Sequence, residues 1–288
     1  MLYLLDLCAN NLHYELMTIT SLMDDYCPKR GFRGEHGLSL YIETADMKLL
    51  LDAGQTDAFI SNAEALGIDL SLLDAVVLSH GHYDHGGGLE VLYDKLAALT
   101  PPLFAGQGFD APRRARNGNH LNDIGLTSAA LPGHSPSPML VSAIEKLGTS
   151  AYILPPAENM DGTEPLARFR VIQDGGEKLD NFNDELSLVF DEKDGMVIVT
   201  GCAHRGILNI AHAAMAAFPG KPIKALVGGF HLVDVADGEL AGIAKTIARL
   251  EPKAVFCAHC TGPRGFSALQ SILPGRVSWL SCGMDISI

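Results

Sequence analysis

The sequence predicts an α/β protein in which short apolar strands run into glycine-bearing loops that carry histidine. Residues 75–78, Ala-Val-Val-Leu, have the length and branched side chains of a buried strand, and a loop rich in histidine and glycine follows them. Residues 89–99 then place apolar side chains at helical spacing, so the loop joins the end of a strand to the start of a helix. Residues 196–218 repeat this order of strand, histidine-bearing loop and helix. The two halves therefore share one plan.

The loop after the first of these strands concentrates potential metal ligands. Four of them fall within six residues: His80, His82, Asp84 and His85. His80 and His82 lie two residues apart on an extended backbone, so both can face one metal ion. Asp84 and His85 follow the turn and can bind a second metal ion. Imidazole with carboxylate suits zinc, iron, manganese and other first-row metals. A solvated polar loop is the alternative, but four such ligands beside three glycines favour a metal site.

This loop also carries a family resemblance. Residues 79–87 match the His-x-His-x-Asp-His signature of the metallo-β-lactamase superfamily, and the matches continue over about residues 35–262, with a poorly matching gap at roughly 100–180. The pattern resembles the branch that includes the archaeal 7,8-dihydropterin-6-yl-methyl-4-(β-D-ribofuranosyl)aminobenzene 5'-phosphate synthases. The resemblance implies a four-layer αββα sandwich, formed as a single domain by residues 1–288. The segments that carry the branch resemblance are Glu35-His-Gly-Leu-Ser39, Leu51-Asp-Ala-Gly54, Thr200-Gly-Cys-Ala-His-Arg-Gly-Ile207, Val227-Gly-Gly-Phe-His-Leu232 and Ala258-His-Cys-Thr-Gly262.

Composition narrows the class of protein. The chain has 288 residues, of which 47% are hydrophobic, so it can bury a large core. Its net charge of −13 argues against a nucleic-acid-binding surface. Residues 1–8 are interrupted by Asp6 and lack a basic leader, so we expect a first strand there rather than a signal peptide, and no apolar run is long enough to span a membrane. Six dispersed cysteines indicate reduced thiols and a cytoplasmic protein.

Two strands are expected upstream of the ligand loop. Residues 38–44 and 48–52 have the apolar content of strands, and the short turn between them predicts a hairpin. The preceding residues 24–34 contain proline and glycine and predict a loop that can lie over one edge of a site. His36 follows that loop, and we expect it to contact substrate.

Asp52 closes the second of these strands, where functional residues of α/β proteins collect. The resemblance implies that it orients a metal-binding histidine, a role that fixes the tautomer and the direction of the ring. The alternative is a strand-end aspartate that caps the helix predicted over residues 57–66.

The range from about 100 to 176 has a weaker pattern. It contains many prolines and glycines and only short apolar runs, which predicts an irregular insertion or lid that recognises substrate. Gly133-His134 superficially resembles a further metal motif of the superfamily, but no strand pair follows it, so we assign it no role. The dense basic cluster of this acidic chain can bind phosphate or carboxylate, or form a solvated face. It comprises Arg113, Arg114 and Arg116.

In the second half of the chain, as in the first, histidines lie at the ends of predicted strands. Strands over residues 225–231 and 254–259 each end in a histidine, and helical spacing over 239–250 separates them. Upstream, residues 186–190 and 196–200 predict two strands joined by a polar turn. Histidines converging from four strand ends strengthen the expectation of a metal site.

The expected ligand sets follow. We assign His80, His82 and His204 to one metal ion, and the resemblance places His259, with Asp84 and His85, on the second. The loop at residues 201–204 stands where many members of the superfamily place a bridging aspartate, and this chain has Cys202 there instead. The site is therefore either mononuclear or bridged by Cys202 or water. Glu185 is a further candidate, either as a metal ligand or as a residue that supports a ligand by hydrogen bonding.

The expected chemistry is hydrolysis by one or two divalent metal ions, zinc first and iron or manganese second. A bound metal lowers the pKa of water from about 16 to near 7, which supplies hydroxide at neutral pH. Asp84 or His231 can then act as the catalytic acid or base, although His231 can instead be a metal ligand or a core histidine. We expect a small anionic substrate, phosphorylated or pterin-like. The alternatives are a condensing synthase of the resembling branch, a non-hydrolytic di-iron redox domain, and a metal-binding sensor.

Overall fold

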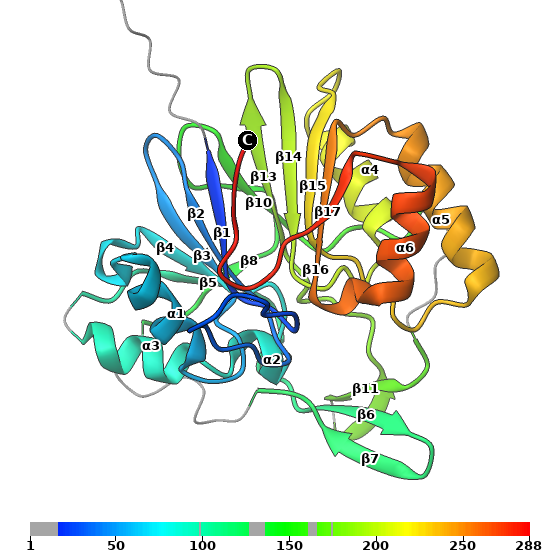
Figure 1. Cartoon of the computed structure of the whole chain (residues 1–288). Coiled ribbons are helices and arrows are strands. Elements are labelled where there is room, and N and C mark those ends of the chain that lie inside the picture. Colours follow the sequence, from blue (N-terminus) through cyan, green and yellow to red (C-terminus); the bar gives the residue numbers. More distant parts are fainter. Residues whose placement is uncertain (1–16, 98, 127–135, 161–165, 174) are drawn as a thin grey trace, which may run out of the picture.

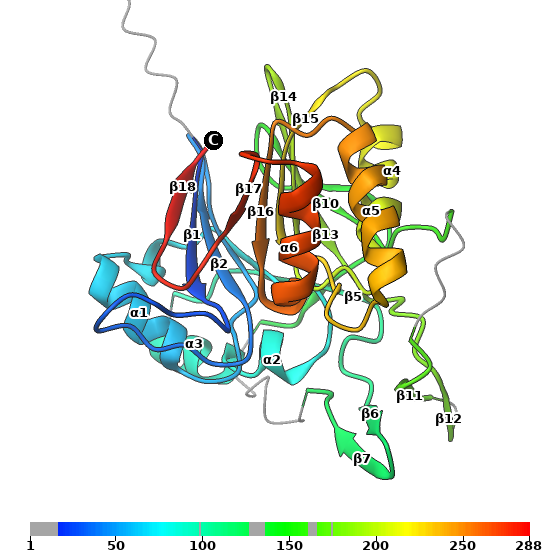
Figure 2. The ribbon, with the colours of Figure 1, turned by 45° about the vertical axis from the view of Figure 1, so that its right-hand side comes forward.

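Two mixed β-sheets pack face to face, and helices cover both outer faces. The computed structural model describes residues 17–97, 99–126, 136–160, 166–173 and 175–288. Figure 1 shows α1 and α3 on the outer side of one sheet and α4, α5 and α6 on the outer side of the other, and Figure 2 shows the same layers from a second direction. This is the predicted αββα sandwich of the metallo-β-lactamase type. The strand predicted at residues 1–8 and the segment around His134 lie outside the described residues.

The first sheet carries the ligand loop at the end of its strand β4. Its strand order is β18-β1-β2-β3-β4-β5-β8, in which β3, β4, β5 and β8 run parallel. The predicted hairpin is the antiparallel pair β2 and β3. The elements of this half are β1 (Thr18–Met23), β2 (Ser39–Glu43), β3 (Lys48–Leu51), α1 (Ala58–Leu66), η1 (Leu70–Leu72), β4 (Ala75–Val77), α2 (Tyr83–Gly86), α3 (Leu89–Leu96), β5 (Leu103–Gly106), β8 (Met139–Val141) and β18 (Asp285–Ser287).

The second sheet brings the ends of β14, β15 and β16 to one edge. Its order is β17-β16-β15-β14-β13-β10-β9, and β14 to β17 run parallel, with Thr200 opposite Gly228 and Gly228 opposite Cys257. The loops that follow these strands therefore lie side by side. The elements of this half are β9 (Glu145–Lys146), β10 (Ala151–Leu154), β13 (Ser187–Glu192), β14 (Gly195–Thr200), α4 (Ile207–Ala217), β15 (Ile223–Gly229), α5 (Asp237–Arg249), β16 (Ala254–Ala258), η3 (His259–Thr261), α6 (Gly262–Ile272) and β17 (Val277–Trp279).

Three apolar layers hold the sandwich together. The central layer fills the space between the sheets, with Leu40 and Val77 from one sheet packed with Val197 and Val227 from the other. A second layer joins the first sheet to α1 and α3, and a third joins the second sheet to α4, α5 and α6. Burial of these strand side chains on both sheet faces explains why the strands read as short continuous apolar runs. No helix among the described residues is long and apolar enough to cross a bilayer.

The range from 100 to 176 is more regular than the sequence indicated. Strands β5, β8, β9 and β10 belong to the two main sheets, so the irregular insertion or lid predicted for the whole range is limited to part of it. A separate four-stranded sheet, ordered β12-β11-β6-β7, projects from the same edge of the sandwich as α2 (Figures 1 and 2). Short strands with few apolar residues gave little periodic signal. This small sheet consists of β6 (Arg113–Asn117), β7 (His120–Asp123), β11 (Phe169–Gln173) and β12 (Gly176–Leu179).

Smaller differences have local causes. The helix predicted over 89–99 ends at Leu96, because Ala97 has a φ of 46°, outside the helical region, and two prolines follow at 101 and 102. Strand β1, Thr18–Met23, was not predicted. It pairs with β2 and with the C-terminal strand β18, so its stability comes from partners remote in sequence.

Candidate metal centre

The ligand loop turns sharply where glycine is required. A Cβ atom on Gly81 would lie 1.6 Å from the carbonyl oxygen of Phe109, so only glycine fits between His80 and His82. The Gly81 N–H donates to Asp184 at 2.8 Å, which fixes the backbone at this point. The short helix α2 then turns Asp84 back toward the same edge of the sheet.

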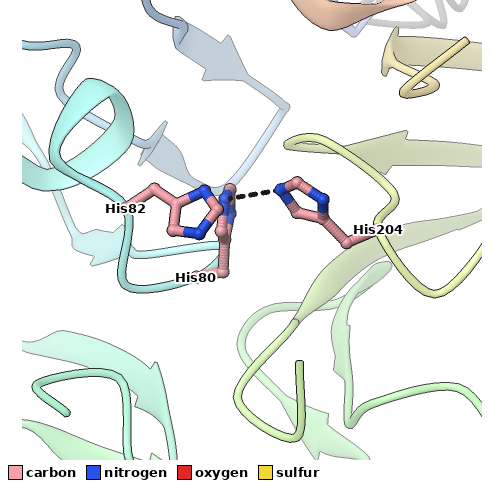
Figure 3. Close-up of side chains that lie close together, drawn as sticks. All are labelled: His80, His82 and His204. Atoms are coloured by element: carbon pink, nitrogen blue, oxygen red, sulfur yellow. Dashed lines mark hydrogen bonds between the residues drawn. The ribbon is translucent and has the colours of Figure 1, made fainter. Parts of the chain in front are cut away.

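His80, His82 and His204 form the first ligand set (Figure 3). The Nε2 atoms of His80 and His204 lie 3.2 Å apart, and one ligand atom from each of the three residues falls within 4.8 Å of the others. Burial lowers the pKa of all three imidazoles well below the ordinary value, which keeps them neutral and able to donate a lone pair. Nε2 of His82 is buried and has no hydrogen-bond partner among the described residues. A cation between the three rings would satisfy it.

Asp84, His85 and His259 form the second set. Oδ2 of Asp84 lies 3.4 Å from Nε2 of His259 and 3.9 Å from Nε2 of His85. All three side chains are buried. The structure therefore brings the two predicted ligand sets together across the sheets, one histidine of each set coming from the second half of the chain.

Cys202 lies between the two sets. Its Sγ is 3.1 Å from Nε2 of His85, and it shares compact groups of ligand atoms with His80 and His85, with His204 and His231, and with His259 and Cys260. Burial raises the pKa of the Cys202 thiol, so a cation would be needed to hold it as a thiolate at neutral pH. The position fits a ligand shared by both sets.

A shell of hydrogen bonds orients these rings. The Asp52 carboxylate lies 2.6 Å from Nδ1 of His85 and accepts from the hydroxyl of Ser79 at 2.7 Å, and that hydroxyl is 2.9 Å from Nδ1 of His80. Asp52 therefore occupies the orienting position that the family resemblance implied. The alternative, that Asp52 caps helix α1, does not hold, because Asp57 is the N-cap residue.

Glu185 lies beneath the loop that carries His204. Its two carboxylate oxygens accept from the backbone N–H groups of His204, at 2.5 Å, and Arg205, at 2.9 Å. Burial raises the pKa of Glu185 to about 7. Since both oxygens accept from the loop backbone, the structure favours the second of the two predicted roles, in which Glu185 supports the position of His204.

Several residues around the candidate metal centre have a strained backbone conformation. Four of the residues that surround the centre have a positive φ although they are not glycine: Asp52 (62°), Ala203 (58°), His231 (46°) and His259 (46°). Such conformations cost free energy and persist where the surrounding structure imposes them, commonly at functional sites.

His231 lies at the rim of the first ligand set. Its ring is 4.2 Å from that of His204 between centroids, and Nε2 is 3.4 Å from Oδ2 of Asp234. Burial lowers the pKa of His231, but the nearby Asp234 carboxylate and the Cys260 sulfur outweigh it and raise the pKa to about 9. A raised pKa favours the protonated ring, as a proton donor or an anion contact requires.

The predicted arginine cluster does not face the centre. Arg113 is buried and forms ion pairs with Asp180, at 2.9 Å, and Asp184, at 2.7 Å, so its predicted contact with substrate is corrected to a structural role. Arg114 pairs with Asp123 at 3.0 Å, and Arg116 points to an exposed position on β6. The strand alternation of β6 places Arg113 on one face and Arg114 and Arg116 on the other, so the three side chains do not form one cluster.

A cavity of about 850 Å³ opens above both ligand sets. Arg168 contributes a cation to its wall, and His36 also lines it, as the prediction of substrate contact requires. Sequence reasoning missed most of the wall because these residues are spread over loops, the small sheet, α6 and β17, where no motif identifies them. The aromatic and amide side chains that line it are Tyr26, Tyr83, Phe169, Phe266, Trp279, Asn117 and Asn122.

Comparison with known proteins agrees with this geometry. The family model of the metallo-beta-lactamase superfamily matches residues 33–100, which include the ligand loop. The crystal structure of Tm1679, described as a metal-dependent hydrolase of the β-lactamase superfamily, is 32% identical, covers 94% of this chain and 99% of its own, and superposes with a TM-score of 0.83. The chain therefore belongs to the metallo-β-lactamase superfamily. The metallo-beta-lactamase fold protein YhfI from Bacillus subtilis, at 14% identity, covers 95% of this chain and 100% of its own with a TM-score of 0.55, which shows the shared fold.

A curated relative supports the predicted branch. The 7,8-dihydropterin-6-methyl-4-(beta-D-ribofuranosyl)-aminobenzene-5'-phosphate synthase of Methanocaldococcus jannaschii is 27% identical over 272 residues, or 85% of this chain and 87% of its own. The chain thus resembles both a protein described as a hydrolase and one named as a synthase.

Proposed function

We propose that this protein is a metal-dependent hydrolase that acts on a small anionic substrate. The observation that carries the proposal is the convergence of His80, His82 and His204, two of which, His82 and His204, line the large cavity, with Nε2 of His82 buried and unpartnered among the described residues. Three neutral imidazoles are a ligand set typical of catalytic zinc, in which a fourth position stays open. When bound there, a divalent metal would activate water and polarise the bond to be cleaved.

The donor atoms favour zinc over the other metals considered. The two sets together offer five imidazoles, one carboxylate from Asp84 and the thiol of Cys202. Nitrogen and sulfur donors suit zinc, whereas magnesium and manganese prefer oxygen. A non-hydrolytic di-iron domain usually relies on carboxylate-rich ligation, which this set does not provide. A sensor without turnover is the remaining alternative, and only an assay separates it from an enzyme.

Two cationic groups on the cavity wall support an anionic substrate. Arg168 stacks its guanidinium on Phe169, 4.4 Å from the ring centroid, and pairs with Asp234 at 2.5 Å. His231 shares Asp234, so the three residues form one polar group beside His204. In this arrangement Arg168 would hold a phosphate or carboxylate of the substrate, and His231 would give a proton to the departing oxygen.

We further propose a phosphorylated or pterin-like substrate. A cavity of about 850 Å³ with Phe169, Phe266 and Trp279 on its wall suits a flat conjugated ring, and Asn117 and Asn122 at the small sheet offer amide partners for ring nitrogens. The relative from M. jannaschii, named a dihydropterin phosphate synthase, favours a second candidate function, in which the same cavity condenses such a ring with a phosphorylated partner.

Metal analysis combined with an activity screen tests the proposal. Protein purified without added metal should contain about two equivalents of metal, mainly zinc, and His82→Ala and His204→Ala should each reduce that content. A panel of phosphomonoesters, phosphodiesters, lactones and pterin phosphates should show turnover that is lost on metal removal and restored by zinc. Metal-loaded protein that consumes a pterin phosphate only with a second substrate would identify the synthase. Protein that holds metal but turns over no member of the panel would favour the sensor, and unchanged metal content in His82→Ala would refute the ligand assignment.

A further inference from the structure

His36 occupies an unexpected position beside the second ligand set. Its Nε2 lies 3.3 Å from Oδ2 of Asp84, almost the same as the 3.4 Å between that oxygen and Nε2 of His259. The two imidazole rings are 4.9 Å apart between centroids. Three imidazoles, those of His36, His85 and His259, therefore direct Nε2 at one carboxylate oxygen.

One carboxylate ties His36 to His259. Oδ1 of Asp25 lies 2.5 Å from Nδ1 of His259, and Oδ2 of Asp25 lies 2.8 Å from Nδ1 of His36. When each Nδ1 carries the hydrogen that it donates to Asp25, both Nε2 atoms present a lone pair toward Asp84. Lone pairs that face a carboxylate oxygen at this distance repel it unless a proton or a metal cation lies between them. A carboxylate that orients the far nitrogen of an imidazole is also the usual support of a metal-binding histidine.

The backbone on either side of His36 is fixed. The Glu35 carboxylate accepts from the N–H groups of Gln55 and Thr56, each at 2.9 Å. Gly37 packs so closely that a Cβ atom there would lie 2.5 Å from the carbonyl oxygen of Asp84. His36 is thus held against the ligand loop although its side chain is 55% exposed to the cavity and solvent.

The Asp25 loop is anchored to the opposite half of the molecule as well. The adjacent Asp24 carboxylate accepts from the backbone N–H of His259 at 2.6 Å and from the indole of Trp279 at 2.8 Å. The loop that carries Asp24 and Asp25 thereby positions a histidine from each half of the chain. Such preorganisation is what a ligand set needs to bind metal tightly.

We propose that His36 is an additional protein ligand of the second metal position, joined with Asp84, His85 and His259, and that Asp25 positions His36 and His259 together. The inference rests on the metal centre of the proposed function. It makes the two positions unequal: the first is held by three imidazoles, which leaves room for substrate or water, and the second is more fully enclosed by protein.

Metal affinity measured by competition with a chromophoric chelator tests this assignment. Wild-type protein should bind two equivalents of zinc. In His36→Ala, the zinc ion at the second position should bind about tenfold or more weakly, and the affinity of the other zinc ion should stay unchanged. Asp25→Asn should weaken binding of the same zinc ion. His120→Ala, at an exposed position on β7, is the matched control and should bind both equivalents as the wild type does. Circular dichroism of the metal-free variants checks that they fold, as expected for an exposed side chain.

The outcomes separate this inference from the function on which it rests. Two equivalents in the wild type with both affinities unchanged in His36→Ala would overturn the ligand role alone, and reduced turnover at unchanged affinity would do the same by assigning His36 to the substrate. Wild-type protein that binds no metal would overturn both proposals. As a second readout, the visible absorption bands of the Co²⁺-loaded protein should change in His36→Ala and stay unchanged in His120→Ala.

Discussion

Nδ1 of His85 lies 2.6 Å from Oδ2 of Asp52, and both side chains are completely buried beneath the ligand loop. This contact joins the end of β3 to the turn after β4, two parallel neighbours in the first sheet. It directs the Nε2 atom of His85 toward Cys202 and Asp84. The orientation of the second ligand set is therefore built into the sheet itself.

Asp52→Asn should weaken metal binding without changing the fold. The amide keeps the shape of the side chain, but it cannot accept in the same way from both His85 and Ser79, so His85 loses its fixed tautomer. We expect affinity for the second metal equivalent to fall by about 10- to 100-fold, measured by chelator competition. Asp69→Asn, at an exposed turn before η1, should leave affinity unchanged. Wild-type affinity in Asp52→Asn would show that the contact supports folding only.

Cys202→Ser should change the spectrum of the Co²⁺-loaded protein. A thiolate bound to Co²⁺ gives an intense charge-transfer band in the near ultraviolet, and we expect this band in the wild type because Cys202 lies within reach of both ligand sets. The band should disappear in Cys202→Ser. Cys257→Ala removes another buried thiol, one that packs in the apolar layer under α5 and α6, and should keep the band. A band that survives in Cys202→Ser would assign the sulfur ligand to Cys260 instead.

The sequence predicted the ligand sets because their signals are local. His80, His82, Asp84 and His85 share one loop, and His204 and His259 each follow a short apolar strand that periodicity identifies. Parallel strands of one sheet must end at the same edge, so their loops converge wherever the chain folds at all. The four layers of the sandwich, and the role of His259 as a ligand of the second set, were implied by the family resemblance and not by this periodicity.

The supporting residues could not be predicted in this way. Arg113 looked like part of a phosphate-binding cluster, yet its partner Asp180 is 67 positions away in the sequence and becomes its neighbour only in the small sheet. Glu185 has the chemistry of a ligand, but two backbone N–H groups occupy its oxygens. The role of a polar side chain depends on the groups that surround it in the folded chain, and the sequence alone does not identify those groups.

Arg113→Ala should destabilise the protein, whereas Arg116→Ala should not. Arg113 is buried with Asp180 and Asp184, and removing it leaves two carboxylates without their cation, which costs about 3–5 kcal/mol of unfolding free energy. Arg116, three positions along the same strand, is exposed, so its removal should change stability by less than about 0.5 kcal/mol. Urea unfolding of both variants makes the comparison. Equal stability of the two would mean that the buried ion pairs contribute little.

The buried histidines also make the stability of the metal-free protein depend on pH. Burial lowers the folded-state pKa of His204 well below 6.5, so below that pH the unfolded chain binds a proton that the folded chain does not, and stability falls as the pH falls. His80 and His82 act in the same direction. Between pH 6 and 5, each such histidine adds about 1.4 kcal/mol per pH unit to the decrease in the free energy of unfolding.

His204→Asn isolates one of these contributions. With chelator present, urea unfolding at several values between pH 5 and 6 should show a slope about 1.4 kcal/mol per pH unit shallower in His204→Asn than in the wild type. His120→Asn, at an exposed position, should keep the wild-type slope. If His204→Asn keeps it too, His204 takes up its proton in the folded state, and the three rings of the first set would not all be neutral lone-pair donors at the pH where metal has to bind.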